Sequence, residues 1–186
     1  MYQWFERPRA YSRGWGEKNA PANESADHAL GRRRGGWGTK LPIVTDGAGL
    51  PLKVRLSPGQ SHESRYFELL LEAIRIGRRS GTVRQRPQRV AGDKGYSHRW
   101  IRQWRRKRGI PAVIPERKDQ RAHRRGRPPK FEREQYRRRN VIERCLGWLK
   151  EARAVATRYE KLALHYLASI HIVMIRRYLR ALANRA

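Results

Sequence analysis

Apolar residues with a regular spacing begin only at Lys40 in this chain. The preceding residues, 1–39, are rich in glycine, arginine, proline and tryptophan and show no sustained periodicity. Within them, GRRRGGWG at residues 31–38 is typical of a flexible basic arm. We therefore expect a basic, mostly irregular arm over residues 1–39 and a domain with its own core over residues 40–186.

The first part of this domain is predicted to be a β-hairpin followed by a helix. KLPIVTD and LPLKVRL predict two short strands that are joined by a tight turn at residues 46–49. Pro42 cannot donate a ladder hydrogen bond, so it belongs at a sheet edge or at a strand entry. After the loop SPGQSHES, apolar residues follow the spacing of an amphipathic helix. These residues are Phe67, Leu70, Leu71 and Ile74.

The second part of the domain alternates further strands and helices. A basic loop, RRSGTVRQRPQ, precedes a short strand at RVAGD, a helix around Trp104 and a second strand at IPAVIP. Residues 115–130 carry seven Lys and Arg against two acids and are expected to form a solvated loop. Two helices, over residues 131–156 and 161–183, are expected to close the chain. This order of elements indicates an α/β fold.

The charge of the chain indicates a polyanionic partner. Its 186 residues include 44 Lys and Arg against 16 Asp and Glu, a formal charge of +28. A free compact state with this charge repels itself, and nucleic acid is the usual partner of such a chain. A basic binding protein without a catalytic site satisfies the same composition, so we keep it as an alternative.

Cysteine usage and hydropathy indicate an intracellular protein. Cys145 is the single cysteine, which excludes a disulfide framework and a cysteine-rich zinc site. The N-terminal residues lack the apolar run of a signal peptide. The most apolar stretch, residues 162–175, is too short to span a bilayer and predicts a buried core helix.

The segment YRRRNVIERCLGWLK, residues 136–150, places one acid among many bases. On a helical wheel, Tyr136, Arg139, Glu143 and Lys150 fall within a sector of about 60°. The opposite side is apolar and is expected to pack on the core. It comprises Val141, Cys145, Trp148, Leu149 and Ala152. Glu143 is therefore either a salt-bridge partner of its neighbours or a functional carboxylate.

Asp93 is a second candidate acid, at the end of the predicted strand RVAGD. Carboxylates at the carboxyl ends of strands in open α/β sheets project into the crevice where ligands bind. An Asp at a strand-to-helix turn is equally suited to cap the helix that follows. Both roles remain open from the sequence.

Three sequence blocks together resemble the insertion-sequence DDE transposases. Tyr136-x2-Arg139-x3-Glu143-x6-Lys150 has the spacing of the family's YREK signature. AGDKGY at residues 91–96 is similar to its second-aspartate motif, and residues 45–64 are similar to its hairpin and following loop. The resemblance extends from about residue 19 to residue 182.

The resemblance implies an RNase H-like fold, with a mixed sheet flanked by helices, and DNA cleavage and strand transfer at a two-metal site. Mg²⁺ or Mn²⁺ would be held by three acids, of which Asp93 would be the second and Glu143 the third. Tyr136, Arg139 and Lys150 would grip DNA phosphates. Further basic residues of the solvated loop would track phosphates, namely Arg124, Arg125, Arg127 and Lys130. The resemblance also implies a homodimer on transposon ends and target DNA, in the bacterial cytoplasm at the nucleoid.

The chain departs from the family at the first acid. The family carries its first catalytic aspartate on a central strand that pairs with the strand bearing Asp93. Residues 1–18 contain no aspartate, and Asp27 and Asp46 align with a linker and a hairpin turn. We therefore expect the C-terminal portion of a transposase that is missing this first, central strand and needs the first acid from an upstream-encoded segment. A catalytically inactive remnant that only binds DNA is the alternative.

The remaining chemical groups give weaker signals. His62 and Glu63 belong to the loop that resembles the family, where they could start a helix or contact DNA. Four of the six tryptophans could stack on flipped bases, although core packing is the better prediction for those in helices. These four are Trp37, Trp100, Trp104 and Trp148. His165 and His171 have no metal-ligand spacing.

Overall fold

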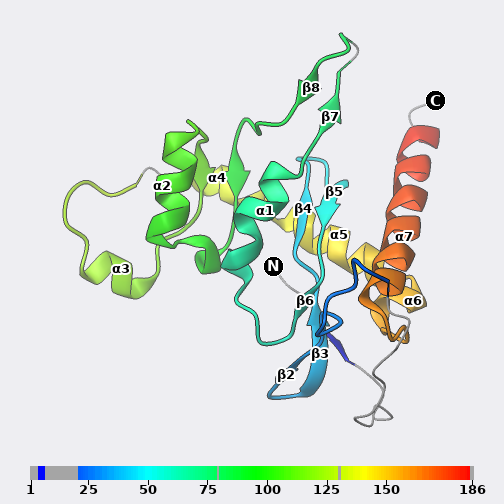
Figure 1. The fold of residues 1–186 in the computed structure, drawn as a ribbon. Helices are drawn as coiled ribbons and strands as arrows, with labels where there is room; N and C mark the ends of the chain where they lie inside the picture. The colour runs from blue at the N-terminus through cyan, green and yellow to red at the C-terminus, as the bar shows by residue number, and fades with distance from the viewer. Residues whose placement is uncertain (1–3, 7–20, 79, 130, 185–186) are drawn as a thin grey trace. The chain divides into compact units, whose positions relative to one another are not determined.

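The fold is that of a computed structural model, which describes residues 4–6, 21–78, 80–129 and 131–184 (Figure 1). The chain divides into two compact units. One comprises His62–Glu143, and the other comprises Tyr2–Ser61 together with Arg144–Ala186. Helices and small sheets alternate along the chain, so the prediction of a mixed α/β protein is confirmed.

In the unit formed by the N-terminal and C-terminal segments, β3 (Gly36–Lys40) is the centre of an antiparallel sheet. It pairs with β1 (Trp4–Glu6), β2 (Gly31–Arg33) and β6 (Ser57–Pro58). Residues 31–38 therefore lie in a hairpin, and the expectation of a flexible arm there is wrong. The boundary between an arm and a domain at residues 39 and 40 remains a prediction.

The predicted hairpin after Lys40 is confirmed. β4 (Ile43–Thr45) pairs antiparallel with β5 (Pro51–Val54), with a register shift after Val44. The turn is closed by Asp46, whose Oδ1 accepts hydrogen bonds from the backbone N–H groups of Ala48 at 2.9 Å and Leu50 at 2.8 Å. This is the local side-chain-to-backbone bonding that makes aspartate a turn residue.

The last helix, α7 (Ala163–Ala183), has one buried face and one exposed face. The buried residues recur at helical spacing and are Ala163, Tyr166, Ile170 and Met174. The exposed apolar residues are Ile172, Ile175, Leu179 and Leu182. The prediction of a helix here is confirmed, but the helix is not buried on all sides, because one neighbouring surface covers only one stripe of a helix. Among the described residues, no helix has the length and apolar composition needed to cross a membrane.

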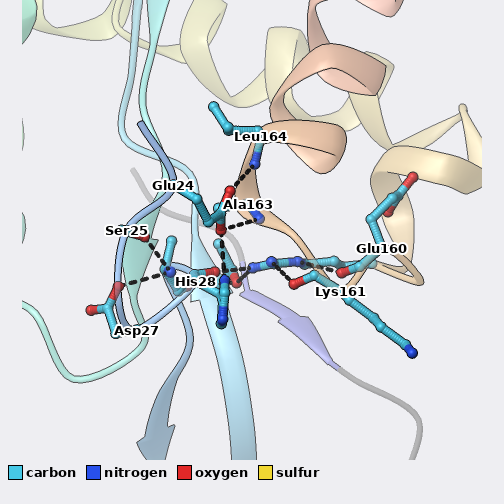
Figure 2. Close-up of polar contacts among 11 residues, drawn as sticks. Glu24, Ser25, Asp27, His28, Glu160, Lys161, Ala163 and Leu164 are labelled. Atoms are coloured by element: carbon cyan, nitrogen blue, oxygen red, sulfur yellow. Dashed lines mark hydrogen bonds and ion pairs between the residues drawn. The ribbon is translucent and has the colours of Figure 1, made fainter. Parts of the chain in front are cut away.

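A buried polar network connects the segment before β2 to the start of α7 (Figure 2). We call it the clasp, and it consists of Glu24, Arg158 and the groups that they bind. The Glu24 carboxylate accepts hydrogen bonds from the backbone N–H groups of Ala163 at 2.7 Å and Leu164 at 3.0 Å. It therefore caps a helix whose own N-cap residue, Leu162, makes no side-chain cap bond.

Arg158 is the second member of the clasp and is only 1% exposed. Its guanidinium donates to Thr39 Oγ1 at 2.6 Å and to three backbone carbonyl oxygens. Those carbonyls belong to His28, Glu160 and Lys161. A buried guanidinium is tolerated because its donors are satisfied in this way.

The other unit begins with the 3₁₀ turn η1 (Glu63–Tyr66) and α1 (Phe67–Glu72). A second 3₁₀ turn, η2 (Lys94–Tyr96), precedes α2 (Arg99–Lys107). The core forms where the Phe67 ring meets the rings of Tyr96 at 5.7 Å, Trp104 at 5.5 Å and Trp100 at 6.3 Å between centroids. Trp104 is buried as predicted, whereas Trp100 remains 39% exposed.

The strands of this unit are short. β9 (Val90–Ala91) and β10 (Ala112–Val113) pair in parallel, at the two positions where strands were predicted. Among the described residues their sheet has two strands, so a larger RNase H-like sheet remains a prediction. The predicted basic loop before β9 is instead an antiparallel hairpin of β7 (Ile76–Gly77) and β8 (Val83–Arg84).

Two predicted segments differ from the structure in their secondary structure. The solvated loop over residues 115–130 contains α3 (Lys118–Ala122). The single helix predicted over residues 131–156 is divided into α4 (Arg133–Arg137), α5 (Asn140–Lys150) and α6 (Arg153–Ala156). The second break follows from Ala152, whose φ of −79° and ψ of 113° are extended rather than helical.

Candidate functional site

Asp93 lies two residues after β9 and caps the turn η2. Its Oδ1 accepts a hydrogen bond from the backbone N–H of Gly95 at 2.8 Å. The capping role that the sequence left open is therefore present. Within the described part of the chain, Oδ2 makes no hydrogen bond, so the carboxylate keeps one oxygen for a further ligand.

Glu143 is bound by the nearest arginine of its helical face. Arg139 Nη2 donates to Glu143 Oε1 at 2.7 Å, and the two side chains are 17% and 33% exposed. The Arg139 guanidinium also lies over the Tyr136 ring, 5.4 Å from its centroid. Tyr136, Arg139 and Glu143 are thus brought together as the helical wheel predicted, even though the chain turns between α4 and α5.

One donor of this group has no partner. Arg139 Nη1 is buried and makes no hydrogen bond within the described residues. A buried guanidinium donor without a partner is unfavourable, and an anionic ligand is one way to satisfy it. Lys150, the fourth residue of the predicted face, ends α5, and burial lowers the pKa of its ammonium. It lies about two helical turns after Glu143.

The basic loop is partly neutralised by one buried acid. Glu116, 11% exposed, pairs with Arg124 at 2.7 Å and with Arg102 at 3.3 Å. Arg125 and Arg127 are exposed and make no ion pair within the described part of the chain. Lys130 lies outside the described residues. A cavity of about 190 Å³ lies beside this loop. It is lined by Ile114, Pro115, Glu116, Arg121, Pro128, Pro129 and Phe131.

A cluster of His62, His98 and Arg117, which sequence reasoning missed, lies against the η2 turn. The His62 and His98 rings are 5.1 Å apart, edge to face, and Arg117 Nη2 lies 3.4 Å from His98 Nε2. Arg117 Nε also donates to the Lys94 carbonyl at 3.2 Å. Burial, and then the charges of Arg117 and His62, lower the pKa of His98. The available signal was the position of His98, one turn beyond the Asp93 motif.

The donors for a metal ion fit in kind but are incomplete in number. Asp93 and Glu143 offer the carboxylate oxygens that Mg²⁺ and Mn²⁺ prefer. Among the described residues, however, no group of three His, Cys, Asp or Glu side chains could hold a metal ion. These residues alone do not form a complete metal site.

Comparison with known proteins gives one match. A family model described as "Transposase DDE domain" matches residues 12–176. The curated proteins and the solved structures contain no match to the chain.

Proposed function

Because the chain belongs to the DDE transposase family, we propose that it acts in DNA cleavage and strand transfer at the ends of an insertion sequence. The observation that carries this proposal is the family match, which covers most of the chain, residues 12–176. It includes the Asp93 turn and the Tyr136, Arg139 and Glu143 group.

Asp93 and Glu143 are the proposed metal-binding acids of this reaction. Asp93 supports the role with an oxygen that remains available after capping, and Glu143 with a partly exposed carboxylate. A pair of Mg²⁺ or Mn²⁺ ions, when bound, would polarise the attacking and leaving oxygens at phosphorus. Oxygen ligands and phosphate suit these ions.

Arg139, Tyr136 and Lys150 are the proposed phosphate-binding residues. Arg139 holds Glu143 through Nη2, and its Nη1 has no hydrogen-bond partner among the described residues, so one guanidinium can orient the acid and bind a phosphate oxygen. The Tyr136 ring lies against one face of this guanidinium and helps to hold its orientation. Arg125 and Arg127 would extend the contact along the DNA backbone.

The first acid of the three is proposed to come from a separate segment that carries the family's first aspartate. The described residues contain no group of three metal-binding side chains, and β9 has a single strand partner among them. An added strand beside β9 would extend this sheet and bring the first aspartate toward Asp93. Assembly with such a segment, in a homodimer on two DNA ends, is the form in which we expect activity.

DNA binding without catalysis is the second candidate function. The observation that favours it is that Asp93 and Glu143 each have a structural role, as a turn cap and as an ion-pair partner. Under this function neither carboxylate acts on DNA, and the positive charge alone accounts for binding.

The test of the proposed function is strand transfer with Mn²⁺ and labelled DNA, by the chain with and without a segment that carries the first-aspartate strand. We expect activity only from the reconstituted protein. Asp93→Asn and Glu143→Gln should abolish it, because both keep the hydrogen bonds seen here but lose the charge.

Glu134→Gln is the matched control, because Glu134, like Glu143, forms an ion pair with an arginine about one helical turn away. Its partner is Arg137, at 2.8 Å. Glu134→Gln should leave activity unchanged. Strand transfer by the chain alone would overturn the need for a first acid from a separate segment. DNA binding without any cleavage in the reconstituted protein would establish the second candidate function.

A further inference from the structure

The β7–β8 hairpin has a well-defined turn. Arg78 N–H donates to the Thr82 carbonyl at 2.9 Å, and Gly81 N–H donates to the Arg78 carbonyl at 3.0 Å. Gly81 has a φ of +78°, and Ser80 Oγ lies 2.9 Å from Thr82 Oγ1. A glycine with positive φ is common in the turns that close hairpins. The described residues of this turn are therefore held by hydrogen bonds to one another.

All the charged residues of the hairpin and its flanks are basic. Residues 75–89 contain no Asp or Glu. They contain six arginines, namely Arg75, Arg78, Arg79, Arg84, Arg86 and Arg89. Among the described residues, only Arg89 of this set has a carboxylate partner, Glu132 at 2.9 Å. Arginines that no acid neutralises remain available to a polyanion.

The strand register places two of these arginines on one face. Ile76 pairs with Arg84, and the hydrogen bond from Arg78 to Thr82 continues the same ladder. Residues two apart in a strand, and residues paired across it, project to the same side. Arg78 and Arg84 therefore share a face with Ile76, while Val83, 54% exposed, projects to the other.

The base of the hairpin is anchored, in contrast to its tip. The Arg86 guanidinium donates to the Gly109 carbonyl, beyond the end of α2, and Arg89 pairs with Glu132. Both partners belong to the same compact unit. The described residues of the turn make their hydrogen bonds with one another. The anchored base fixes the direction of the hairpin, and the described residues of the tip remain available to bind a partner.

We propose that the β7–β8 hairpin is a DNA-binding ribbon that enters the major groove of duplex DNA, with Arg78 and Arg84 as its contact residues. The major groove admits a two-stranded β-ribbon, and arginine forks bind phosphates and guanine edges there. The inference rests on the proposed function for its choice of DNA as the polyanion. It adds a contact surface that uses neither Asp93 nor Glu143.

The first test measures binding of the full chain to a labelled duplex of arbitrary sequence, in EDTA, across a salt series. Arg78→Ala/Arg84→Ala should reduce the slope of log affinity against log salt by about 1.8, from about 0.9 per lost phosphate contact. The matched control, Arg176→Ala/Arg180→Ala, removes the same charge from exposed positions of α7 and should change the slope little. Equal slopes for the two double variants would overturn the proposal.

The second test separates shape from charge, because its variants keep every arginine. Gly81→Ala forces a side chain into a positive φ, so we expect about fivefold weaker duplex binding, which corresponds to about 1 kcal/mol. Gly77→Ala is the control, since no atom lies within 4 Å of the added Cβ and φ is not positive there. Wild-type affinity of Gly81→Ala would show that the ribbon geometry plays no part. Far-UV circular dichroism verifies that each variant is folded.

A groove-specific competitor completes the test. Methyl green, which occupies the major groove, should abolish the difference between the wild type and Arg78→Ala/Arg84→Ala. Netropsin, which occupies the minor groove, should leave that difference intact, and the reverse result would overturn the proposal. Because all these measurements are made without metal, they remain informative if Asp93 and Glu143 prove to have no catalytic role.

Discussion

The clasp and the candidate site use the same kinds of side chain in opposite ways. In the clasp, Arg158 is 1% exposed and the Glu24 side chain 2% exposed, and both bind several partners. In the candidate site, and counting only partners in the described part of the chain, Asp93 accepts one hydrogen bond and Glu143, 33% exposed, forms one ion pair. Charges that are buried and satisfied maintain the fold, whereas charges with spare capacity can bind a ligand.

The largest effect that this contrast predicts is at Arg158. Arg158→Met keeps the apolar stem but leaves the buried hydroxyl of Thr39 and the carbonyl oxygens of His28, Glu160 and Lys161 without this donor. We expect the free energy of unfolding to fall by about 3 kcal/mol or more. Arg153→Ala, at an exposed position of α6, should change it by about 0.5 kcal/mol or less. Urea unfolding measures both, and similar losses would break the contrast.

Glu24 is expected to have the next largest effect. Glu24→Ala removes the carboxylate that caps α7 and should lower the free energy of unfolding by about 1–2 kcal/mol. Burial alone would raise the pKa of Glu24, but hydrogen bonds from Leu164, His28 and Ala163 bring it below its ordinary value of 4.5.

The same pKa shift gives the pH dependence of that effect. A carboxyl that is more acidic in the folded state stabilises the protein fully above its ordinary pKa. This contribution is lost as the pH falls through the folded-state pKa. Urea unfolding from pH 7 to pH 3 should therefore show the wild type and Glu24→Ala converging in acid. A constant difference between them would contradict the assignment of Glu24 as an ionised cap.

Two substitutions of Asp93 are expected to affect stability differently and strand transfer equally. Asp93→Ala removes the cap of η2 and should cost about 1 kcal/mol, whereas Asp93→Asn keeps a capping oxygen and should cost about 0.5 kcal/mol or less. Both should abolish strand transfer by the reconstituted protein. Thermal unfolding and the DNA assay, run on the same samples, decide the matter. Activity in Asp93→Asn would reduce this residue to a structural cap.

Glu143 is expected to have the smallest effect on stability. A partly exposed ion pair one helical turn apart contributes about 0.3–0.5 kcal/mol, so Glu143→Gln should be close to the wild type in urea. A loss as large as that of Glu24→Ala would place Glu143 with the clasp.

Local sequence patterns predicted the elements whose apolar residues are periodic. The β4–β5 hairpin, α1, α2, β9, β10 and α7 lie where spacing and turn residues placed them. The face shared by Tyr136, Arg139 and Glu143 was also predicted, because helical geometry brings residues three and four apart together.

The missed features depend on contacts that no local pattern records. The clasp joins His28 to Arg158 and Glu24 to Ala163, residues that are 130 and 139 positions apart. The β7–β8 hairpin has two-residue strands with exposed Ile76 and Val83, too short for an alternating pattern. The Gly81 turn was the available signal for that hairpin.

The proposed function requires Asp93 and Glu143 to bind one divalent-metal centre on DNA, in the protein reconstituted with the first-aspartate segment. In that reconstituted protein, Fe²⁺ in place of Mg²⁺, with duplex DNA, ascorbate and peroxide, generates hydroxyl radicals that cleave the protein backbone beside the bound ion. Mass spectrometry of the fragments should show cleavage near both Asp93 and Glu143 and the loss of both sites in Asp93→Asn. Cleavage near only one of the two acids, or sites that persist in Asp93→Asn, would contradict the account.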